Sequence, residues 1–497
     1  MNRLRSLLTA AILVLSAPVW AAAADAGPGG PKRPNVLLIL SDDLTSMHLG
    51  CYGDPLAHTP NIDRLAARGV RFDKAYCQFP LCNPSRASFL TGLRPDTLRV
   101  YDLKTQFRQN VPNAQSVGQT FQKAGYHVMR VGKLYHYGVP LQIGTDGLDD
   151  APSWAERYNP AGRDVKEDVP QIARTEFDPI EGKTVVKTNN EPNQFGGNLS
   201  WLAADGADDE QTDGKVAAKA IELLEANKDK PFFLGVGFFR PHTPFVAPRQ
   251  YFGFYPLEKV PVWAEPAGWR ASVPPIALIA KPDQDHMSAD QKRLAAQAYF
   301  AATSFMDAQV GRVIDALDRL KLADNTVIVF ASDHGYQLGE HNQWQKMTLF
   351  EDCARVPMII ASPGGARGAT SPRVVELVDL HATLADLTGV PAPATDGVSL
   401  KPLVLAADAP WARPAVTQVT RVLPRGVLGG AGRNVMGYSV RTDRYRYTEW
   451  NGGAQGSELY DHDTDPHELK NLAADPAHAA TVSSLKKLLP AKGAGRR

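Results

Sequence analysis

The feature that most constrains the fold of this 497-residue chain is a set of short, uninterrupted apolar runs separated by helical segments. The runs occupy residues 35–40, 231–239, 325–331 and 356–361. Continuous apolar runs of this length are typical of strands that are buried on both faces of a parallel sheet. A long helical segment starts at Ser288, with Gln291 in the capping-box position. The alternation predicts an α/β fold with a mostly parallel sheet flanked by helices.

Polar residues follow three of these runs directly. Asp42 and Asp43 come after the first strand, Asp333 and His334 follow a later strand, and the turn at residues 240–242 follows a third. The functional crevice of a parallel sheet lies outside the carboxyl ends of its strands. We therefore expect the three strand ends to meet at one rim.

The acidic residues at these strand ends indicate a cation site. Asp42 and Asp43 alone could be ordinary helix caps, and Asp333 with His334 is equally weak by itself. Together they bring three carboxylates to one place, where they would repel one another without a cation. Oxygen-rich ligands favour a hard divalent ion, calcium ahead of magnesium, whereas zinc prefers histidine and cysteine.

The segment at residues 81–92 places a cysteine at the start of a predicted helix. Pro84 suits the first helical position, and the helix would run to Gly92, with Cys82 beside Arg86. Free amides, the helix dipole and a guanidinium would together hold a tetrahedral oxyanion. In isolation the same pattern also fits a small buried cysteine before an ordinary helix.

The rest of the chain suggests three parts, a signal peptide at 1–24, a catalytic domain at 33–400 and a C-terminal α+β subdomain at 412–490. Within the last part, short strands are expected at 416–419, 436–441 and 445–450, followed by a final helix. Residues 146–206 show few periodic runs. They are expected to form a long loop insertion near the substrate entrance or a surface excursion.

The N-terminus predicts export. Arginines in residues 1–5, an apolar run at 7–19 and small residues at 21–24 are typical of a cleaved secretory signal, although a retained anchor is the alternative. No later run reaches the roughly 20 apolar residues that a transmembrane helix needs. We therefore expect a periplasmic or secreted protein without stable membrane insertion. A net charge of +1 argues against nucleic acid as a partner.

Several motifs resemble one enzyme family. Cys-Asn-Pro-Ser-Arg at 82–86, followed by Leu-Thr-Gly at 90–92, resembles the signature of type I sulfatases, whose cysteine is oxidised after translation to formylglycine. Residues 34–43 and 59–65 resemble the opening of the same family. The chain is most similar to the iduronate-2-sulfatase group, through residues 94–97, 132–136, 240–245, 332–335, 338–341 and 344–346. The resemblance implies an alkaline-phosphatase-like sulfatase fold with a smaller C-terminal antiparallel sheet.

The resemblance also implies a metal site and a nucleophile. Asp42, Asp43, Asp333 and His334 would bind one calcium, and the aldehyde made from Cys82 would contact the metal as its hydrate. One hydroxyl of that hydrate would attack sulfur, and the second would allow the resulting sulfate hemiacetal to collapse. A formylglycine-generating enzyme is therefore an expected partner.

Five further residues are expected to act in catalysis. By the same resemblance Arg86, Lys133 and Lys346 would neutralise the sulfuryl oxygens. His242 would protonate the departing sugar oxygen, and His136 would help to release sulfate. Taken singly, each lysine could be an ordinary surface residue and each histidine a structural one.

The leading hypothesis is hydrolysis of a sulfate ester on a sulfated carbohydrate, such as a 2-O-sulfated uronic acid. The alternatives are a phosphate or phosphonate monoester hydrolase of the same superfamily, and a catalytically silent protein that binds sulfated glycans. Arg99 and Arg108 are candidate partners for a sugar carboxylate. Further candidate sugar contacts are Tyr336, His341 and Trp344. If Cys82 is modified, the remaining three cysteines allow at most one internal disulfide.

Overall fold

The computed structural model describes residues 33–195, 198–279, 281–423 and 433–490. The predicted signal peptide lies outside the described residues. Within the described part of the chain, no helix is long and apolar enough to cross a membrane. Residues from Arg33 onward form one compact unit, so the domain boundary expected between 400 and 412 stays a prediction.

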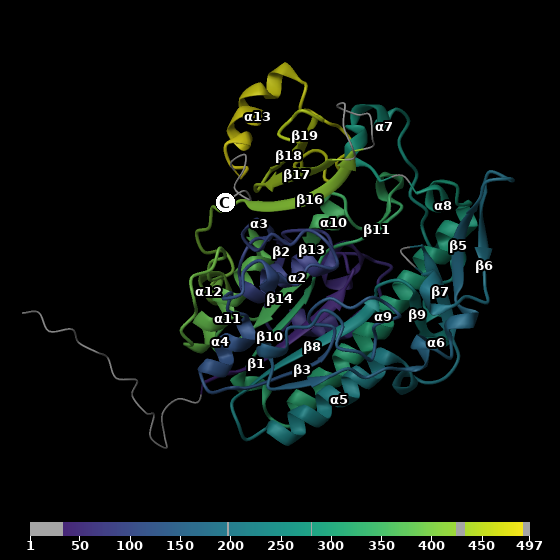
Figure 1. Ribbon diagram of the computed structural model, residues 1–497. Coiled ribbons are helices and arrows are strands. Elements are labelled where there is room, and N and C mark those ends of the chain that lie inside the picture. The colour runs from purple at the N-terminus through teal and green to yellow at the C-terminus, as the bar shows by residue number, and fades with distance from the viewer. Residues whose placement is uncertain (1–32, 196–197, 280, 424–432, 491–497) are drawn as a thin grey trace, which may run out of the picture. The chain divides into compact units, whose positions relative to one another are not determined.

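A nine-stranded sheet forms the centre of the protein (Figure 1). Its middle consists of parallel strands in the order β10 (Thr326–Ser332), β1 (Asn35–Asp42), β8 (Phe232–Pro241), β3 (His127–Gly132) and β4 (Glu156–Tyr158). Beyond β10 the sheet continues with β14 (Met358–Ala361) and β2 (Val70–Tyr76), and both β13 (Arg355–Val356) and β15 (Ala369–Glu376) pair with β2. β13 and β14 run antiparallel to their partners. The predicted α/β fold with a mostly parallel sheet is confirmed.

Helices cover both faces of this sheet, which explains why the central strands β1, β8 and β10 are buried along their whole length. Leu37 and Ile39 of β1 pack into one core cluster, whereas Val36, Leu38 and Leu40 pack into the other. The first face is covered by α1 (Pro60–Ala66), α5 (Thr212–Asn227) and α9 (Ala289–Arg319). The second is covered by α2 (Cys82–Thr91), α4 (Val117–Lys123) and α11 (Leu380–Thr388). The predicted capping box of Ser288 and Gln291 begins α9.

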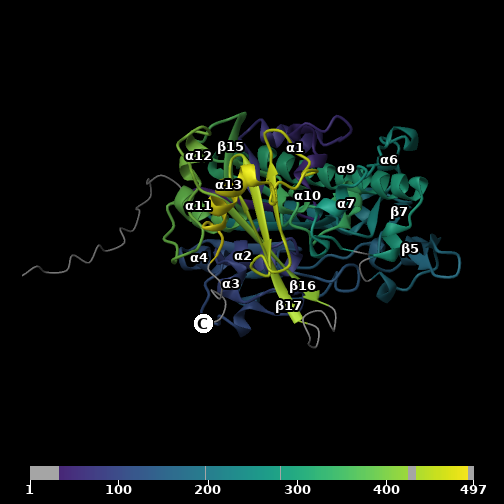
Figure 2. The ribbon, with the colours of Figure 1, turned by 90° about the horizontal axis from the view of Figure 1, so that it is seen from above.

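The interpretation of residues 146–206 as a loop insertion was wrong in part. This region contributes β5 (Ala173–Asp178), β6 (Lys183–Lys187) and β7 (Ser200–Ala204) to a second sheet, completed by β9 (Phe245–Pro248). The strand that completes this sheet lies about forty residues beyond the region itself, so local periodicity could not reveal it. In both Figure 1 and Figure 2, β5 and β7 lie on the right of the molecule, whereas α4 and α11 lie on the left.

The C-terminal region forms an antiparallel sheet, as predicted. Its strands are β16 (Ala415–Leu423), β17 (Arg433–Arg441), β18 (Tyr445–Trp450) and β19 (Ser457–Asp461), followed by α13 (Ala479–Lys486). The strand β19 was not expected. The buried carboxylate of Glu351 joins this sheet to β2, because it accepts a hydrogen bond from Tyr76 at 2.8 Å and pairs with Arg446.

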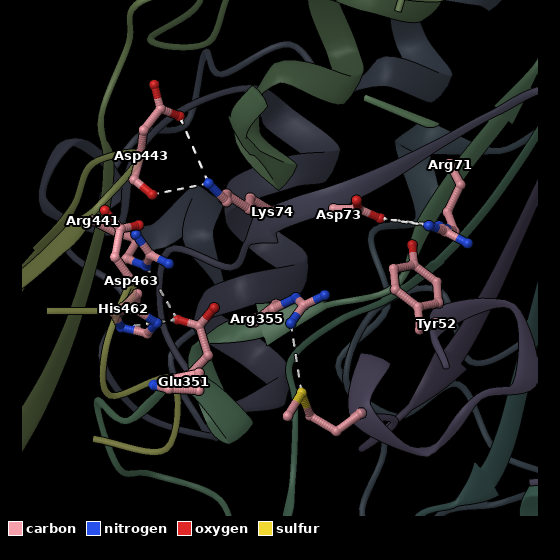
Figure 3. A pocket seen from close by; sticks show the side chains of 12 residues that line it. Tyr52, Arg71, Asp73, Lys74, Glu351, Arg355, Arg441, Asp443, His462 and Asp463 are labelled. Atoms are coloured by element: carbon pink, nitrogen blue, oxygen red, sulfur yellow. Dashed lines mark hydrogen bonds and ion pairs between the residues drawn. The ribbon is translucent and has the colours of Figure 1, made fainter. Parts of the chain in front are cut away.

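A polar cavity of about 320 Å³ lies beside this junction (Figure 3). Several of its charged side chains pair with one another: Arg71 lies 2.9 Å from Asp73, and Lys74 lies 4.0 Å from Asp443. None of the predicted catalytic residues lines this cavity. Arg71 and Asp73 both lie on β2, whereas the pair between Lys74 and Asp443 joins β2 to the turn after β17 and so helps to hold the C-terminal sheet against the central sheet.

Candidate active site

The three predicted strand ends meet at one rim, because β10, β1 and β8 are neighbours in the sheet. Ser41 pairs with Ser332, and Asp42 pairs with Pro241, so the residues that follow each strand emerge side by side. Two overlapping groups of side chains could hold a metal ion, because each residue of a group offers one ligand atom within 4.8 Å of the others. The first group is Asp42, Asp43, Cys82 and His242. The second group is Asp42, Cys82, Asp333 and His334.

Asp43 is held in an unusual backbone conformation at the end of β1. Its φ angle of 65° lies in the left-handed region, which non-glycine residues rarely adopt. The hydroxyl of Tyr299 donates to the carbonyl of Asp43 at 2.8 Å, and the amide of Asp43 donates to Asp333 Oδ1 at 3.2 Å. These bonds fix a local strain of a kind that clusters at functional sites.

Cys82 is the first residue of the fully buried helix α2. The helix ends at Gly92, as predicted, but Pro84 occupies its third position rather than its first. This placement is tolerated because amides in the first turn have no intrahelical acceptor. The Cys82 sulfur lies 3.2 Å from Lys346 Nζ and 3.4 Å from His334 Nε2. Burial disfavours the thiolate, but Lys346, Lys133 and His334 outweigh it and hold the pKa of Cys82 well below its usual value.

Arg86 binds the strand ends together from one turn further along α2. Its Nε donates to Asp333 Oδ2 at 2.8 Å, and one terminal nitrogen donates to Asp42 Oδ1 at 3.2 Å. The remaining donors reach the carbonyls of Ser41, Lys133 and Leu134. All five N–H groups of this buried guanidinium therefore face protein acceptors, and Arg86 acts on the site through the two carboxylates.

Lys133 reaches the site because two glycines let β3 and β8 approach closely. Its amide donates to the carbonyl of Gly237 at 2.8 Å. A Cβ at Gly237 would lie 2.1 Å from the Lys133 carbonyl oxygen, and a Cβ at Gly132 would lie 2.1 Å from the Gly237 carbonyl oxygen. Only glycine fits at either position, and the fully buried ammonium of Lys133 pairs with Asp42.

The electrostatics of the cluster fit a divalent cation. Burial opposes ionisation of Asp42, but Lys133, His242 and Arg86 keep its pKa low. Burial raises the pKa of Asp333 to about 6 although Arg86 and His334 oppose the shift. Burial would lower the pKa of His334, but Asp333 and Asp43 raise it to about 9.

The carboxylates of this cluster are buried and stay ionised only beside positive charge. Such oxygen ligands suit a hard metal ion. The His334 ring is oriented for it, because Nδ1 bonds to the Gly335 carbonyl at 2.9 Å and Nε2 lies 3.3 Å from Asp43.

Two further histidines lie beside the cluster. His242 Nδ1 bonds to the Thr243 carbonyl at 2.5 Å, and its Nε2 lies 3.8 Å from Asp43 Oδ2. His136 lies near Cys82 and Lys133, and burial lowers the pKa of its imidazole. The structure thus brings every predicted site residue to one place.

The turn that carries His242 depends on a residue that sequence reasoning missed. Asp213, in the first turn of α5, accepts hydrogen bonds from the amides of Phe239 at 2.8 Å and Arg240 at 2.9 Å. Arg240 in turn pairs with Asp164. From sequence, Asp213 resembles an ordinary acidic residue at a helix N-terminus, so no local signal distinguishes it.

The additional sugar-binding candidates have other roles. Arg108 is committed to Asp150 at 2.5 Å and to backbone carbonyls. His341 is buried, stacks on Phe350 at 4.2 Å and bonds to the His467 carbonyl. Tyr336 and Trp344 are also buried, and Arg99 is exposed at the end of α3 (Pro95–Leu98).

All four cysteines are free, so the disulfide that the cysteine count allowed is absent.

Comparison with known proteins gives the family. The sulfatase family model matches residues 34–390, and the model for the C-terminal region of N-sulphoglucosamine sulphohydrolase matches residues 339–494. The chain therefore belongs to the sulfatase family and is a sulfuric ester hydrolase. It is similar to iduronate 2-sulfatase of Mus musculus, with 33% identity over 91% of this chain and 93% of that protein.

Solved structures show the same fold. A phosphonate monoester hydrolase of Agrobacterium radiobacter has a TM-score of 0.73 and 24% identity, over 92% of this chain and 94% of that one. A 2-O GAG sulfatase has a TM-score of 0.69 and 23% identity, over 94% and 96% of the two chains. These likenesses confirm the predicted sulfatase-like fold.

Replacing Asp213 by alanine should impair catalysis without touching the site directly. The change leaves two buried amides without an acceptor, which costs on the order of 1–3 kcal/mol each, and releases the His242 turn. We expect kcat on the sulfate ester of an aliphatic alcohol, whose leaving group needs a proton, to fall at least about tenfold while KM changes little. Asp209→Ala, at an exposed position four residues earlier, is the matched control. Equal kcat in the two variants would show that Asp213 does not position His242.

Proposed function

We propose that the protein hydrolyses sulfate esters of a sulfated carbohydrate, in the periplasm or after secretion, and that its substrate is a 2-O-sulfated uronic acid. The observation that carries the reaction is the position of Cys82, 3.2 Å from Lys346 and 3.4 Å from His334 at the start of a buried helix. The substrate class is supported by the similarity to iduronate 2-sulfatase.

The proposed reaction needs a metal ion and a modified cysteine, neither of which is encoded in the sequence. Calcium, held by Asp42, Asp43, Asp333 and His334, would supply a Lewis acid that neutralises sulfuryl oxygens. Conversion of Cys82 to formylglycine by a maturation enzyme would supply a nucleophilic hydroxyl and a second hydroxyl for sulfate release. Both fit a cluster whose carboxylates and thiol are fully buried beside three cationic side chains.

The side chains of the site stabilise charge and transfer protons. Lys346 Nζ lies 2.8 Å from Asp43 and contacts Cys82, so it can stabilise negative charge on the transferred group. Lys133 pairs with Asp42 on the other side. The Nε2 atom of His242 faces the site. We assign His242 the role of general acid, which donates a proton to the departing sugar oxygen. His136, which lies near Cys82, would accept a proton in the release step.

A phosphate or phosphonate monoester hydrolase is the second enzymatic candidate, favoured by the fold shared with phosphonate monoester hydrolases. A two-metal phosphatase needs a second cation centre beside the first. Among the described residues the remaining acidic cluster, Glu351, His462 and Glu468, already surrounds Arg446, whose Nε lies 2.5 Å from Glu468. A silent glycan-binding protein would not need Cys82, His136 and His242 in this arrangement.

Sulfate release tests the proposal directly. Protein co-produced with a formylglycine-generating enzyme is assayed on a 2-O-sulfated uronate disaccharide, a 6-O-sulfated hexosamine and an aryl sulfate. We expect the uronate to be the best substrate, and both Cys82→Ala and a chelator to abolish release. Release from the hexosamine or the aryl ester alone would contradict the uronate assignment. Hydrolysis of a phosphonate monoester in preference to all three would favour the second candidate.

The roles of His242 and His136 can be separated by leaving group. A sugar alkoxide needs a proton on departure, whereas nitrophenolate does not. His242→Gln should therefore lower kcat by about 10²–10⁴ on the sugar sulfate but by less than about tenfold on a nitrophenyl sulfate. His136→Gln should slow both substrates alike, because sulfate release follows departure of the alcohol. Equal losses on both substrates for His242→Gln would exclude it as the general acid.

A further inference from the structure

The polar cavity beside the C-terminal sheet is lined by Arg355 of β13, whose guanidinium has few partners. Figure 3 shows this half-buried side chain between Glu351 and Tyr52. Its Nε atom is buried without a hydrogen-bond partner, and a terminal nitrogen reaches only the sulfur of Met47 at 3.6 Å. Among the residues that the structure describes, no carboxylate forms an ion pair with Arg355. The guanidinium therefore retains N–H groups that have no acceptor in the protein.

The carboxylates that line the cavity already have cationic partners. Three of them lie 2.9, 4.0 and 3.2 Å from a cation, in the pairs Asp73–Arg71, Asp443–Lys74 and Asp463–Arg444. The fourth, Glu351, is shared, because Arg446 pairs with it and Arg441 Nε lies 3.4 Å from it. Glu468 lies 2.5 Å from Arg446 on its other side. Together with Arg355, three arginines thus share two carboxylates, which leaves an excess of positive charge.

Further positive charge lies on the neighbouring strand β2. Burial lowers the pKa of the half-buried Lys74 ammonium, and repulsion by Arg441 adds to the shift. The guanidinium of Arg71 lies 5.2 Å from the ring centroid of Tyr52, and that of Arg355 lies 5.9 Å from the same ring. Basic side chains from β2, β13 and β17 therefore line a cavity of about 320 Å³. This volume is within the range of small-ligand sites, roughly 300–1,000 Å³.

We propose that this cavity binds a sulfate group, with Arg355 as its main partner and Arg441 and Lys74 beside it. Guanidinium and ammonium groups bind tetrahedral oxyanions through charge-assisted hydrogen bonds. A sulfate group would supply both the missing acceptors and the missing negative charge. Its source is either the ion that the enzyme's own reaction releases or a sulfate ester on a sugar. The site is separate from the catalytic centre, since none of the predicted catalytic residues lines the cavity.

Sulfate binding to a protein that cannot turn over tests the proposal. In the Cys82→Ala background, calorimetry measures the binding of inorganic sulfate and, separately, of a 6-O-sulfated hexosamine. We expect a binding site that Arg355→Gln weakens at least about tenfold, because the variant loses charge-assisted hydrogen bonds. Arg367→Gln is the control for the loss of one positive charge. The exposed Arg367 side chain lies 3.9 Å from Asp324, outside this cavity, so its replacement should leave the affinity unchanged.

The two ligands identify the source of the sulfate group. Tighter binding of the sulfated sugar than of inorganic sulfate at the site that depends on Arg355 would assign the site to a sulfate ester. The reverse order would assign it to the released ion. Crystals soaked in selenate, which replaces sulfate and is located by its anomalous scattering, should show an ion beside Arg355 that is absent from Arg355→Gln.

Two results would overturn the proposal. One is the same affinity and stoichiometry for both ligands in Arg355→Gln as in the protein that retains Arg355. The other is a selenate ion beside Arg355 in crystals without binding in solution that depends on Arg355, which would indicate an adventitious ion only. Thermal unfolding separates loss of the site from a folding defect. A variant that only folds less stably would have a lower Tm but would keep the full increase in Tm that sulfate produces.

Discussion

Mutual repulsion among buried carboxylates is the constraint on which the rest of the structure depends. Asp42, Asp43 and Asp333 are fully buried at the ends of adjacent strands. Unpaired charges in such a place would destabilise the fold by several kcal/mol each. Three cationic side chains, which are also buried or nearly so, pair with these carboxylates. Arg86 comes from α2, Lys133 from the end of β3, and Lys346 from the loop before α10 (Glu351–Ala354). The fold therefore delivers positive charge to this rim from three directions.

Much of this arrangement could be predicted from sequence, because its signals are local. Continuous apolar runs identify the buried strands, and the polar residues that end them identify the rim. The capping box at Ser288 gave the start of α9. The family motif then supplied roles for Cys82, His136 and His242, and the structure brings these side chains together.

What could not be predicted depends on contacts between distant segments. The sheet formed by β5, β6 and β7 is completed by β9, and the turn that carries His242 is held by Asp213. Arg86 looked like a direct sulfate ligand, yet the folded chain surrounds its five donors with carboxylates and carbonyls. Side chains like these are recruited by tertiary structure, which leaves no periodic trace in the sequence.

The most direct test of the account is calorimetric titration of the purified, metal-free protein with calcium and, separately, with magnesium. We expect one calcium per chain, weaker binding of magnesium, and a large loss of calcium affinity in Asp43→Asn and Asp333→Asn. Two metal ions per chain, or calcium affinity that survives both substitutions, would contradict the assignment of a single cation site to the strand ends of β1 and β10.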